Sequence, residues 1–311
     1  MFEILSNSKK ICYNIRSIIL EEFALFFKEK GMAVEPLDFS VQSTIGCGPH
    51  ASQAVYPRSF TELIELIDFC VANKKRYAIL GSLSNVLPPE QESGTLFIIT
   101  KRLVGATFGE TPLVYTGMTA GAFLKECEIY GKTGAEFLSG IPCTMGGAAF
   151  MNAGACGRYM DEIVRSVIVY RRGELKSFAK EECQYSYKHS RFMEDGSVIF
   201  AVMLNLSNAT GEEVEAKKRE YLEKRKALPI GRSMGCIFKN PAGLSAGQLI
   251  EGAGLKGLRI GGAHISEAHA NFIINDKGAT VRDVKTLIQL MKNAVYAQYR
   301  VQLEEEIRYL V

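Results

Sequence analysis

Apolar side chains recur at helical spacing near the start of the chain. Residues 11–31 carry them in the run IRSIILEEFALFF and reach Gly31, a residue type that commonly ends helices. A second stretch, residues 59–73, opens with Ser59 followed three residues later by a glutamate, which is the signature of a helix N-terminus. We therefore expect an N-terminal helix packed on the body of the protein and a second helix that leads into the apolar strand YAIL.

Short runs of β-branched and aromatic residues follow, separated by turn residues rather than by long helices. They predict strands at residues 96–99, 114–116, 164–170 and 198–206. This spacing favours a mixed α+β nucleotide-binding module and not the regular alternation of a Rossmann fold.

The composition changes after Asn208. Residues 210–229 read TGEEVEAKKREYLEKRKALP and predict a solvated helix. We assign this helix no catalytic role, because charge runs are usually exposed faces. A further module is expected from Gly231, with strands that include residues 270–275 and a helix over residues 280–303.

The chain has 311 residues, which is enough for two or three modules with separate cores. The shifts in pattern predict an N-terminal helix at residues 1–33, a domain at 34–208 and a domain at 209–311. The first domain is expected to consist of two lobes, at residues 34–100 and 101–208.

The net charge of +3, from 37 basic and 34 acidic residues, argues against a nucleic-acid binder. The eight cysteines show no spacing typical of zinc sites or redox pairs, so we expect reduced thiols and no metal. No secretion signal and no apolar run of about 18 residues is present, so we expect a cytoplasmic protein that does not insert into membranes.

Two glycine-rich stretches have the composition of phosphate-binding loops. Residues 134–157 read GAEFLSGIPCTMGGAAFMNAGACG, and residues 79–85 read ILGSLSN, a strand that runs into a Gly/Ser/Asn turn. Where no side chain intervenes, backbone amides can cradle phosphate. A tight turn without a ligand explains each stretch equally well when it is taken singly.

The run GCIFKNP, residues 235–241, combines a possible proton donor, Cys236, with Lys239 and Asn240 on a turn bounded by glycine and proline. These residue types are suited to an anionic substrate and to protonation of a carbanion. Taken alone, a small cysteine beside apolar residues is more often part of a core.

The order and wording of these motifs, from about residue 36 to 308, resemble the UDP-N-acetylenolpyruvoylglucosamine reductase (UDP-N-acetylmuramate dehydrogenase) family of bacterial peptidoglycan synthesis, in its shorter form without an extra substrate-covering loop. The resemblance implies an α+β fold, with a two-lobed FAD-binding domain of the vanillyl-alcohol-oxidase/PCMH type and a C-terminal α+β substrate-binding domain. It also implies that NADPH reduces bound FAD and that the enolpyruvyl ether of a UDP-sugar is then reduced in the same cleft.

The resemblance further implies which residues contact FAD. They come from STIGCGPHA, residues 43–51, and from the two glycine-rich stretches. They are Gly46, Gly81, Ser82, Leu83, Ser84, Asn85, Gly140, Pro142, Thr144, Gly146, Gly147, Asn152, Ala153 and Gly154.

By the same resemblance, three residues are catalytic. Lys188 in YSYKHSRF occupies the position of the family's arginine, Cys236 that of its proton-donating serine, and Glu306 in LEEEIRYL that of its carboxylate. Without the motifs, Lys188 and Glu306 would be interpreted as solvated surface residues. The implied substrate contacts are Tyr187, Lys239, Asn240, His269 and Arg308.

Two of the replacements change the expected chemistry. An ammonium lacks the planar two-point grip of a guanidinium, so Lys188 should hold a carboxylate less well, and Arg191 would point to the opposite face of an extended segment. A thiol has a reference pKa of about 8.5, so Cys236 should donate a proton at neutral pH, be sensitive to alkylation and ionise at alkaline pH.

The departures from the family pattern, at Cys47, Ser82, Leu83, Cys143 and Lys188, leave alternatives open. Larger side chains in place of glycine would weaken the hold on a diphosphate. The alternatives are a degenerate flavin- or nucleotide-binding paralogue without reductase activity and a non-catalytic module of the cell-wall pathway. The oligomeric state is left open, with a monomer favoured.

Overall fold

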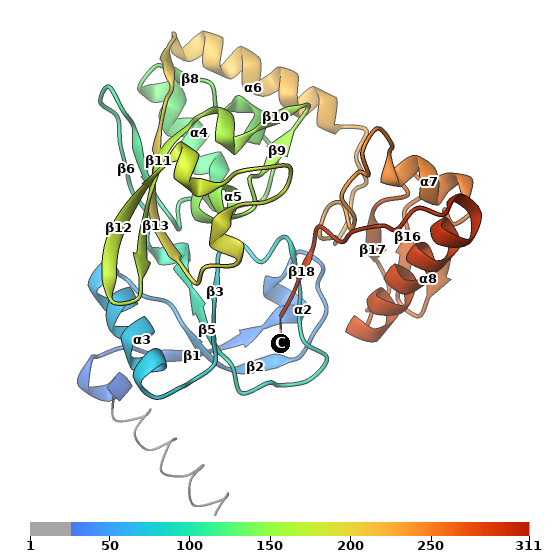
Figure 1. Ribbon diagram of the computed structural model, residues 1–311, viewed down its shortest axis with the longest axis horizontal. Helices are drawn as coiled ribbons and strands as arrows, with labels where there is room; N and C mark the ends of the chain where they lie inside the picture. Colours follow the sequence, from blue (N-terminus) through green and yellow to red (C-terminus); the bar gives the residue numbers. More distant parts are fainter. Residues whose placement is uncertain (1–25, 311) are drawn as a thin grey trace, which may run out of the picture.

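The computed structural model of the chain describes residues 26–310 (Figure 1). Most of the predicted N-terminal helix lies outside these residues. Its described end, residues 26–29, is helical, and Gly31 follows with a left-handed φ of +62°.

The first lobe is built on a four-stranded sheet in the order β1-β2-β5-β3, in which β2, β5 and β3 run parallel and β1 is antiparallel. Helix α3 connects β2 to β3 and buries four apolar side chains, while Ser59 caps its first turn as predicted. The elements are β1 (Val34–Asp38), α2 (Phe39–Gln42), β2 (His50–Val55), α3 (Phe60–Ala72), β3 (Tyr77–Leu80), β4 (Val86–Leu87), β5 (Leu96–Ile99) and the 3-10 helix η1 (Thr100–Arg102).

The second lobe is an antiparallel sheet in the order β12-β11-β13-β7-β6, with α4 and α5 packed on it. Its sheet strands are β6 (Ala106–Thr107), β7 (Leu113–Tyr115), β11 (Val164–Arg171), β12 (Glu174–Ala179) and β13 (Val198–Leu204). The other elements are α4 (Ala120–Ile129), β8 (Lys132–Thr133), η2 (Glu136–Leu138), α5 (Met145–Phe150), β9 (Gly154–Ala155), β10 (Arg158–Tyr159), η3 (Met160–Glu162), η4 (Lys180–Cys183), η5 (Arg191–Met193) and β14 (Ser207–Asn208).

Helix α6 (Gly211–Arg225) runs from this lobe to the C-terminal module, drawn in orange and red in Figure 1. That module packs α8 and α7 on a small antiparallel sheet, β15-β16-β17. Its elements are α7 (Ala246–Gly252), β15 (Arg259–Ile260), β16 (Ala263–Ile265), β17 (Ile273–Asn275), α8 (Val281–Tyr299) and β18 (Arg308–Tyr309).

The last strand, β18, leaves the C-terminal module and returns to the first lobe, where it pairs in parallel with β4 (Figure 1). The contact between the two parts is reinforced by Asn275, a buried residue whose Nδ2 donates to the backbone oxygens of Ile45 and Gly46 at 2.9 and 2.8 Å. The predicted domain boundaries remain predictions, but the chain crosses between the parts more than once.

The predicted strands at residues 96–99, 114–116, 164–170 and 198–206 are confirmed, with shifts of one or two residues at four of their eight ends. Helices α4, α5 and α7 were not predicted, and strands β1, β2 and β12 were missed as well. Helix α8 ends four residues before residue 303, since Arg300 adopts a left-handed φ of +58° and stops it.

No helix within residues 26–310 combines the length and the apolar character needed to cross a membrane. Within the same residues, no three or more His, Cys, Asp or Glu side chains gather in a way that would hold a metal ion.

Candidate active site

Lys188 lies in a tight turn, residues 186–189, whose ends exchange two backbone hydrogen bonds of 3.1 Å. Its φ of +55° is left-handed, so the extended backbone expected from the sequence is wrong. A non-glycine residue in this region costs about 1–2 kcal/mol, which the surrounding contacts must offset. The turn therefore aims the Lys188 side chain in one fixed direction.

Asn152 supports this turn from the glycine-rich stretch. Its Nδ2 donates to the backbone oxygen of Ser186 at 2.9 Å, and its Oδ1 accepts from the backbone nitrogen of Asp161 at 2.9 Å. The residue is 2% exposed. Both ends of its amide are thus occupied within the protein, so Asn152 positions the turn that carries Lys188.

Glu306 is brought to Lys188 by the returning C-terminal segment. Its backbone nitrogen donates to the Ile237 oxygen at 2.8 Å, and its backbone oxygen accepts from Nδ2 of Asn85 at 3.1 Å. The backbone oxygen of Asn85 also accepts a hydrogen bond from the backbone nitrogen of Arg308 at 3.0 Å. The predicted cofactor-binding turn and the predicted catalytic carboxylate are therefore held together by one asparagine.

The structure brings the three predicted catalytic residues into one cluster. Lys188 Nζ lies 2.9 Å from Glu306 Oε1, and the two side chains are only 15% and 14% exposed. Cys236, on the segment paired with Phe272, is half-buried within electrostatic range of both. An ion pair and a thiol within its electrostatic range thus lie where segments of the second lobe and the C-terminal module meet.

Burial and this pairing change the protonation of the cluster. Burial, reinforced by the Glu306 carboxylate, raises the pKa of the Cys236 thiol to about 11. Burial favours the neutral form of Lys188, but the neighbouring Glu306 outweighs it and raises the pKa of the amine. At neutral pH the thiol therefore carries its proton and the amine is charged. The expectation of an acidic thiol near its reference pKa is wrong, because it ignored burial.

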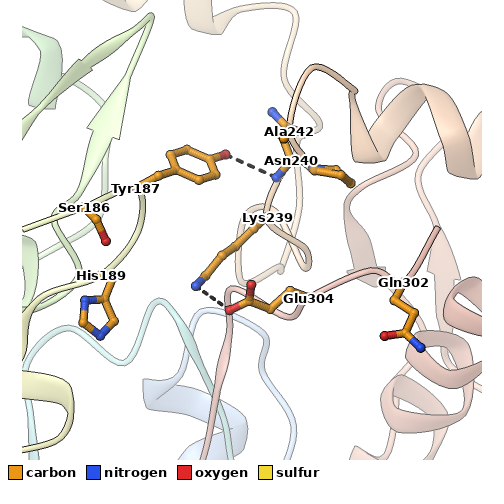
Figure 2. A pocket seen from close by; sticks show the side chains of 9 residues that line it. Ser186, Tyr187, His189, Lys239, Asn240, Ala242, Gln302 and Glu304 are labelled. Carbon is orange, nitrogen blue, oxygen red and sulfur yellow. Dashed lines mark hydrogen bonds and ion pairs between the residues drawn. The ribbon is translucent and has the colours of Figure 1, made fainter.

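Beside this cluster lies a pocket of about 530 Å³ between the turn 186–189 and the C-terminal module (Figure 2). The Tyr187 hydroxyl reaches across it and accepts from the backbone nitrogen of Asn240 at 3.3 Å, while Lys239 Nζ bonds Glu304 at 2.6 Å. Its lining residues are Ser186, Tyr187, His189, Lys239, Asn240, Pro241, Ala242, Gln302 and Glu304.

The other predicted substrate residues differ in their surroundings. Asn240 uses its Oδ1 to accept from the backbone nitrogen of Ala246 at the start of α7. His269 packs against Phe272, and its Nδ1 accepts from the backbone nitrogen of Asn271, while burial lowers its pKa. Arg308 is exposed two residues beyond Glu306. Of the five predicted residues, the pocket brings Tyr187, Lys239 and Asn240 together.

Arg191, considered from sequence as a substitute for Lys188, is committed elsewhere. Its Nε bonds Oδ2 of Asp195 at 3.0 Å, its Nη1 donates to the backbone oxygen of Glu182, and its guanidinium stacks on Phe178 at 4.0 Å. It holds 3-10 helix η5 to the lobe and does not face the cluster.

The turn after β3 has free backbone donors. The N–H groups of residues 82–85 make no hydrogen bond to any residue between 26 and 310. Leu83 adopts a left-handed φ of +56° and turns its side chain into the core beside Leu80 and Phe97. A run of outward amides of this kind suits a diphosphate, so the residues present fit the diphosphate of FAD although Ser82 and Leu83 replace glycines.

The second glycine-rich stretch contributes differently from the expected loop of open amides. Gly146 donates its N–H to the Thr116 oxygen, and Gly147 donates to the Thr144 side chain that caps α5. A Cβ on Gly81 would lie 2.3 Å from Oγ1 of Thr144. These glycines let the turn after β3 and the second glycine-rich stretch approach each other closely. We call these two segments together the FAD cradle. In the same stretch, the buried hydroxyl of Ser139 has no hydrogen-bond partner among the described residues.

We expect Gly146→Ala to destabilise the protein by about 1–3 kcal/mol and to reduce FAD retention. A Cβ at Gly146 would stand 1.9 Å from Oγ1 of Thr116 and 3.0 Å from its backbone oxygen, so a buried segment would have to move. Thermal unfolding with and without FAD measures both effects.

Gly121→Ala is the matched control for that substitution. It lies in α4 with nothing within 4 Å of its missing Cβ, and should slightly stabilise the protein. Equal melting temperatures for the Gly146 variant and the parent would show that the close packing of α5 is unimportant.

Comparison with known proteins places these features in context. Residues 51–178 match the model of the FAD binding domain, and residues 223–310 match that of the UDP-N-acetylenolpyruvoylglucosamine reductase C-terminal domain. The chain is similar to the UDP-N-acetylenolpyruvoylglucosamine reductase of Alkaliphilus oremlandii, with 36% identity over 88% of this chain and 91% of the relative. The corresponding protein of Chlamydia pneumoniae is 37% identical over 86% and 88%.

A solved structure supports the same relationship. The crystal structure of the UDP-N-acetylenolpyruvylglucosamine reductase from Thermus caldophilus superimposes with a TM-score of 0.78 at 32% identity. It covers 90% of this chain and 100% of that one. The sequence and structure comparisons therefore agree over nearly the whole chain.

Proposed function

Because the chain belongs to the UDP-N-acetylenolpyruvoylglucosamine reductase family, we propose that Lys188, Cys236 and Glu306 form its catalytic centre. The chain is an FAD-containing oxidoreductase with a two-domain α+β fold. It reduces UDP-N-acetylglucosamine enolpyruvate to UDP-N-acetylmuramate in peptidoglycan synthesis, with NADPH as co-substrate. The observation that carries the proposed centre is the largely buried Lys188–Glu306 pair beside the Cys236 thiol.

FAD, when bound, would supply the hydride transfer from NADPH to the terminal carbon of the enolpyruvyl double bond. Negative charge then builds up on the enolpyruvyl carboxylate. A fixed cation aimed at such charge is usually the largest single contribution to catalysis. Lys188 supplies it, held in place by its left-handed turn and by Glu306 at 2.9 Å.

Cys236 completes the reaction by donating its Sγ proton to the carbon next to the carboxylate. Its raised pKa of about 11 keeps the thiol protonated at neutral pH, as a donor must be. The thiolate left behind lies within electrostatic range of the Lys188 ammonium, which stabilises it until a proton from solvent restores the thiol.

The remaining predicted residues divide between the two ligands. The free amides of residues 82–85, with Gly46, Ser84 and Asn85, would hold the diphosphate of FAD. The pocket lined by Tyr187, Lys239 and Asn240 opens next to Lys188 and would take the nucleotide part of the substrate. Arg308 and His269 are proposed as outer substrate contacts.

Anaerobic half-reactions test this proposal. NADPH should bleach the flavin absorbance of the FAD-loaded protein, and the enolpyruvyl nucleotide should then restore it. Bleaching without recovery would contradict the proposed catalytic centre. A chain that binds no FAD would also contradict the proposal that residues 82–85 hold the FAD diphosphate. The comparisons do not favour the alternative of a degenerate paralogue. A cytoplasmic location and a monomeric state remain predictions.

A further inference from the structure

Arg225, the last residue of α6, turns its side chain toward the second glycine-rich stretch, residues 134–157. A Cβ placed on Gly140 would lie 3.0 Å from its Nε and 3.2 Å from its Cδ, so the arginine covers this glycine. Its guanidinium is also within electrostatic range of Cys143, Cys156 and Cys236. The end of a helix interpreted from sequence as solvated thus places a cation within electrostatic range of the proposed proton donor.

This guanidinium has no hydrogen bond or ion pair with any residue between 26 and 310, although the side chain is half-buried. Two other cations of the site already have counter-ions, since Lys188 pairs with Glu306 and Lys239 pairs with Glu304. Burial lowers the pKa of Arg225, but a guanidinium remains charged at any physiological pH. A partly buried charge without a counter-ion is costly, which points to a counter-ion supplied by a ligand.

The charge balance of the cluster agrees with this. Lys188 and Glu306 cancel, and the raised pKa of Cys236 keeps the thiol neutral. With Arg225 included, this group of side chains therefore has a net positive charge. Both the cofactor and the substrate of the proposed reaction are anions, so this charge has the sign that they require.

We propose that Arg225 binds a carboxylate or phosphate oxygen of a ligand in the active-site cleft. In the proposed reaction Cys236 protonates the carbon that bears the enolpyruvyl carboxylate, so a cation within electrostatic range of Cys236 has the sign needed to attract that carboxylate. A guanidinium grips a carboxylate at two points, which Lys188 cannot do. The inference rests on the proposed function, because it takes the substrate from there.

Binding to the FAD-loaded, oxidised protein tests the proposal by titration calorimetry. Arg225→Met should weaken binding of UDP-N-acetylglucosamine enolpyruvate about 10- to 100-fold, the usual loss for a hydrogen bond to a charged group. Binding of UDP-N-acetylglucosamine, which lacks the carboxylate, should stay within about twofold. Arg225→Lys keeps the charge without the planar fork, and should fall between the parent and Arg225→Met.

Lys226→Met is the matched control, because it removes the same charge one residue along, from an exposed side chain paired with Glu223. It should bind every ligand like the parent. Arg225→Met could instead weaken the binding of FAD, or of both sugar nucleotides, by tenfold or more. The oxyanion bound by Arg225 is then a phosphate of that ligand, and the proposal is supported with phosphate in place of carboxylate.

Two outcomes overturn the proposal. If Arg225→Met and Arg225→Lys bind FAD, NADPH and the enolpyruvyl nucleotide within about twofold of the parent, Arg225 does not bind an oxyanion, and the proposed function is unaffected. If the parent itself fails to bind the enolpyruvyl nucleotide, the proposed function fails and this inference fails with it.

Discussion

Substitution of Glu306 by glutamine is expected to slow reduction of the enolpyruvyl substrate about 100- to 1,000-fold, the range found when one group that stabilises developing charge is removed. Glutamine keeps the shape of the side chain but removes the charge that holds Lys188 at 2.9 Å. Reduction of FAD by NADPH does not need the substrate's carboxylate to be stabilised. Its rate should therefore stay within about threefold of the parent, and stopped-flow absorbance separates the two half-reactions.

The same substitution should lower stability by about 2 kcal/mol, less than the 3–5 kcal/mol typical of fully buried pairs, because both side chains keep some solvent contact. Without the carboxylate, burial is the largest remaining influence on Lys188 and lowers the pKa of its amine. A double-mutant cycle with Lys188→Met measures the coupling. If the pair acts as a unit, the double variant should lose far less than the sum of the two single losses.

Glu305→Gln is the control for this experiment. Glu305 is the preceding residue and pairs with Lys292 at 2.9 Å, so the substitution breaks an equally short ion pair that has no role in the proposed centre. It should leave both half-reactions unchanged. Full substrate reduction by the Glu306 variant, with the control also active, would remove Glu306 from the catalytic centre.

Of the helices, α3 and α6 could be predicted from the sequence, but α5 could not. The capping signature predicted α3 and the charged run predicted α6, because both signals lie within the helix itself. Helix α5 escaped prediction because its sequence, MGGAAF, has poor helix formers at two of six positions and depends on bonds to distant residues such as Thr116. A local pattern contains no information about such a partner.

For the site, the family motifs predicted Lys188, Cys236 and Glu306 as catalytic residues, and the structure shows how the three meet. The pairing of β18 with β4 involves two residues on each strand, too few for any periodicity to indicate. Arg225 was hidden in a charged run, because sequence alone does not say which face of α6 reaches the cleft. Burial was the other missing quantity, and it raises the pKa of Cys236 to about 11, above the reference value used for the sequence.

Replacement of Cys236 by alanine should reduce the rate of substrate reduction about 10²- to 10⁴-fold, the usual contribution of a positioned general acid. Cys236→Ser should keep most of the activity, since a hydroxyl at the same place can donate a proton along the same path. Rapid-reaction kinetics of the oxidative half-reaction measures both. Wild-type rates in the alanine variant would show that the proton comes from another group.

The raised pKa of Cys236 gives a test that does not depend on turnover. At a pKa of about 11 the thiolate fraction at pH 7 is roughly 300-fold smaller than for a thiol of pKa 8.5. Because the thiolate is the reactive form, alkylation of Cys236 should be slow at neutral pH and still rise between pH 9 and 10. Activity that requires the neutral thiol should be retained through that range and fall only as the pH approaches 11.

To measure labelling of Cys236 alone, the exposed thiol of Cys156 is first removed by Cys156→Ser. Peptide mass spectrometry then follows the alkylation of Cys236. A labelling rate that levels off near pH 9 would mean that the thiol is not shielded, and that the cluster with Lys188 and Glu306 does not control its proton.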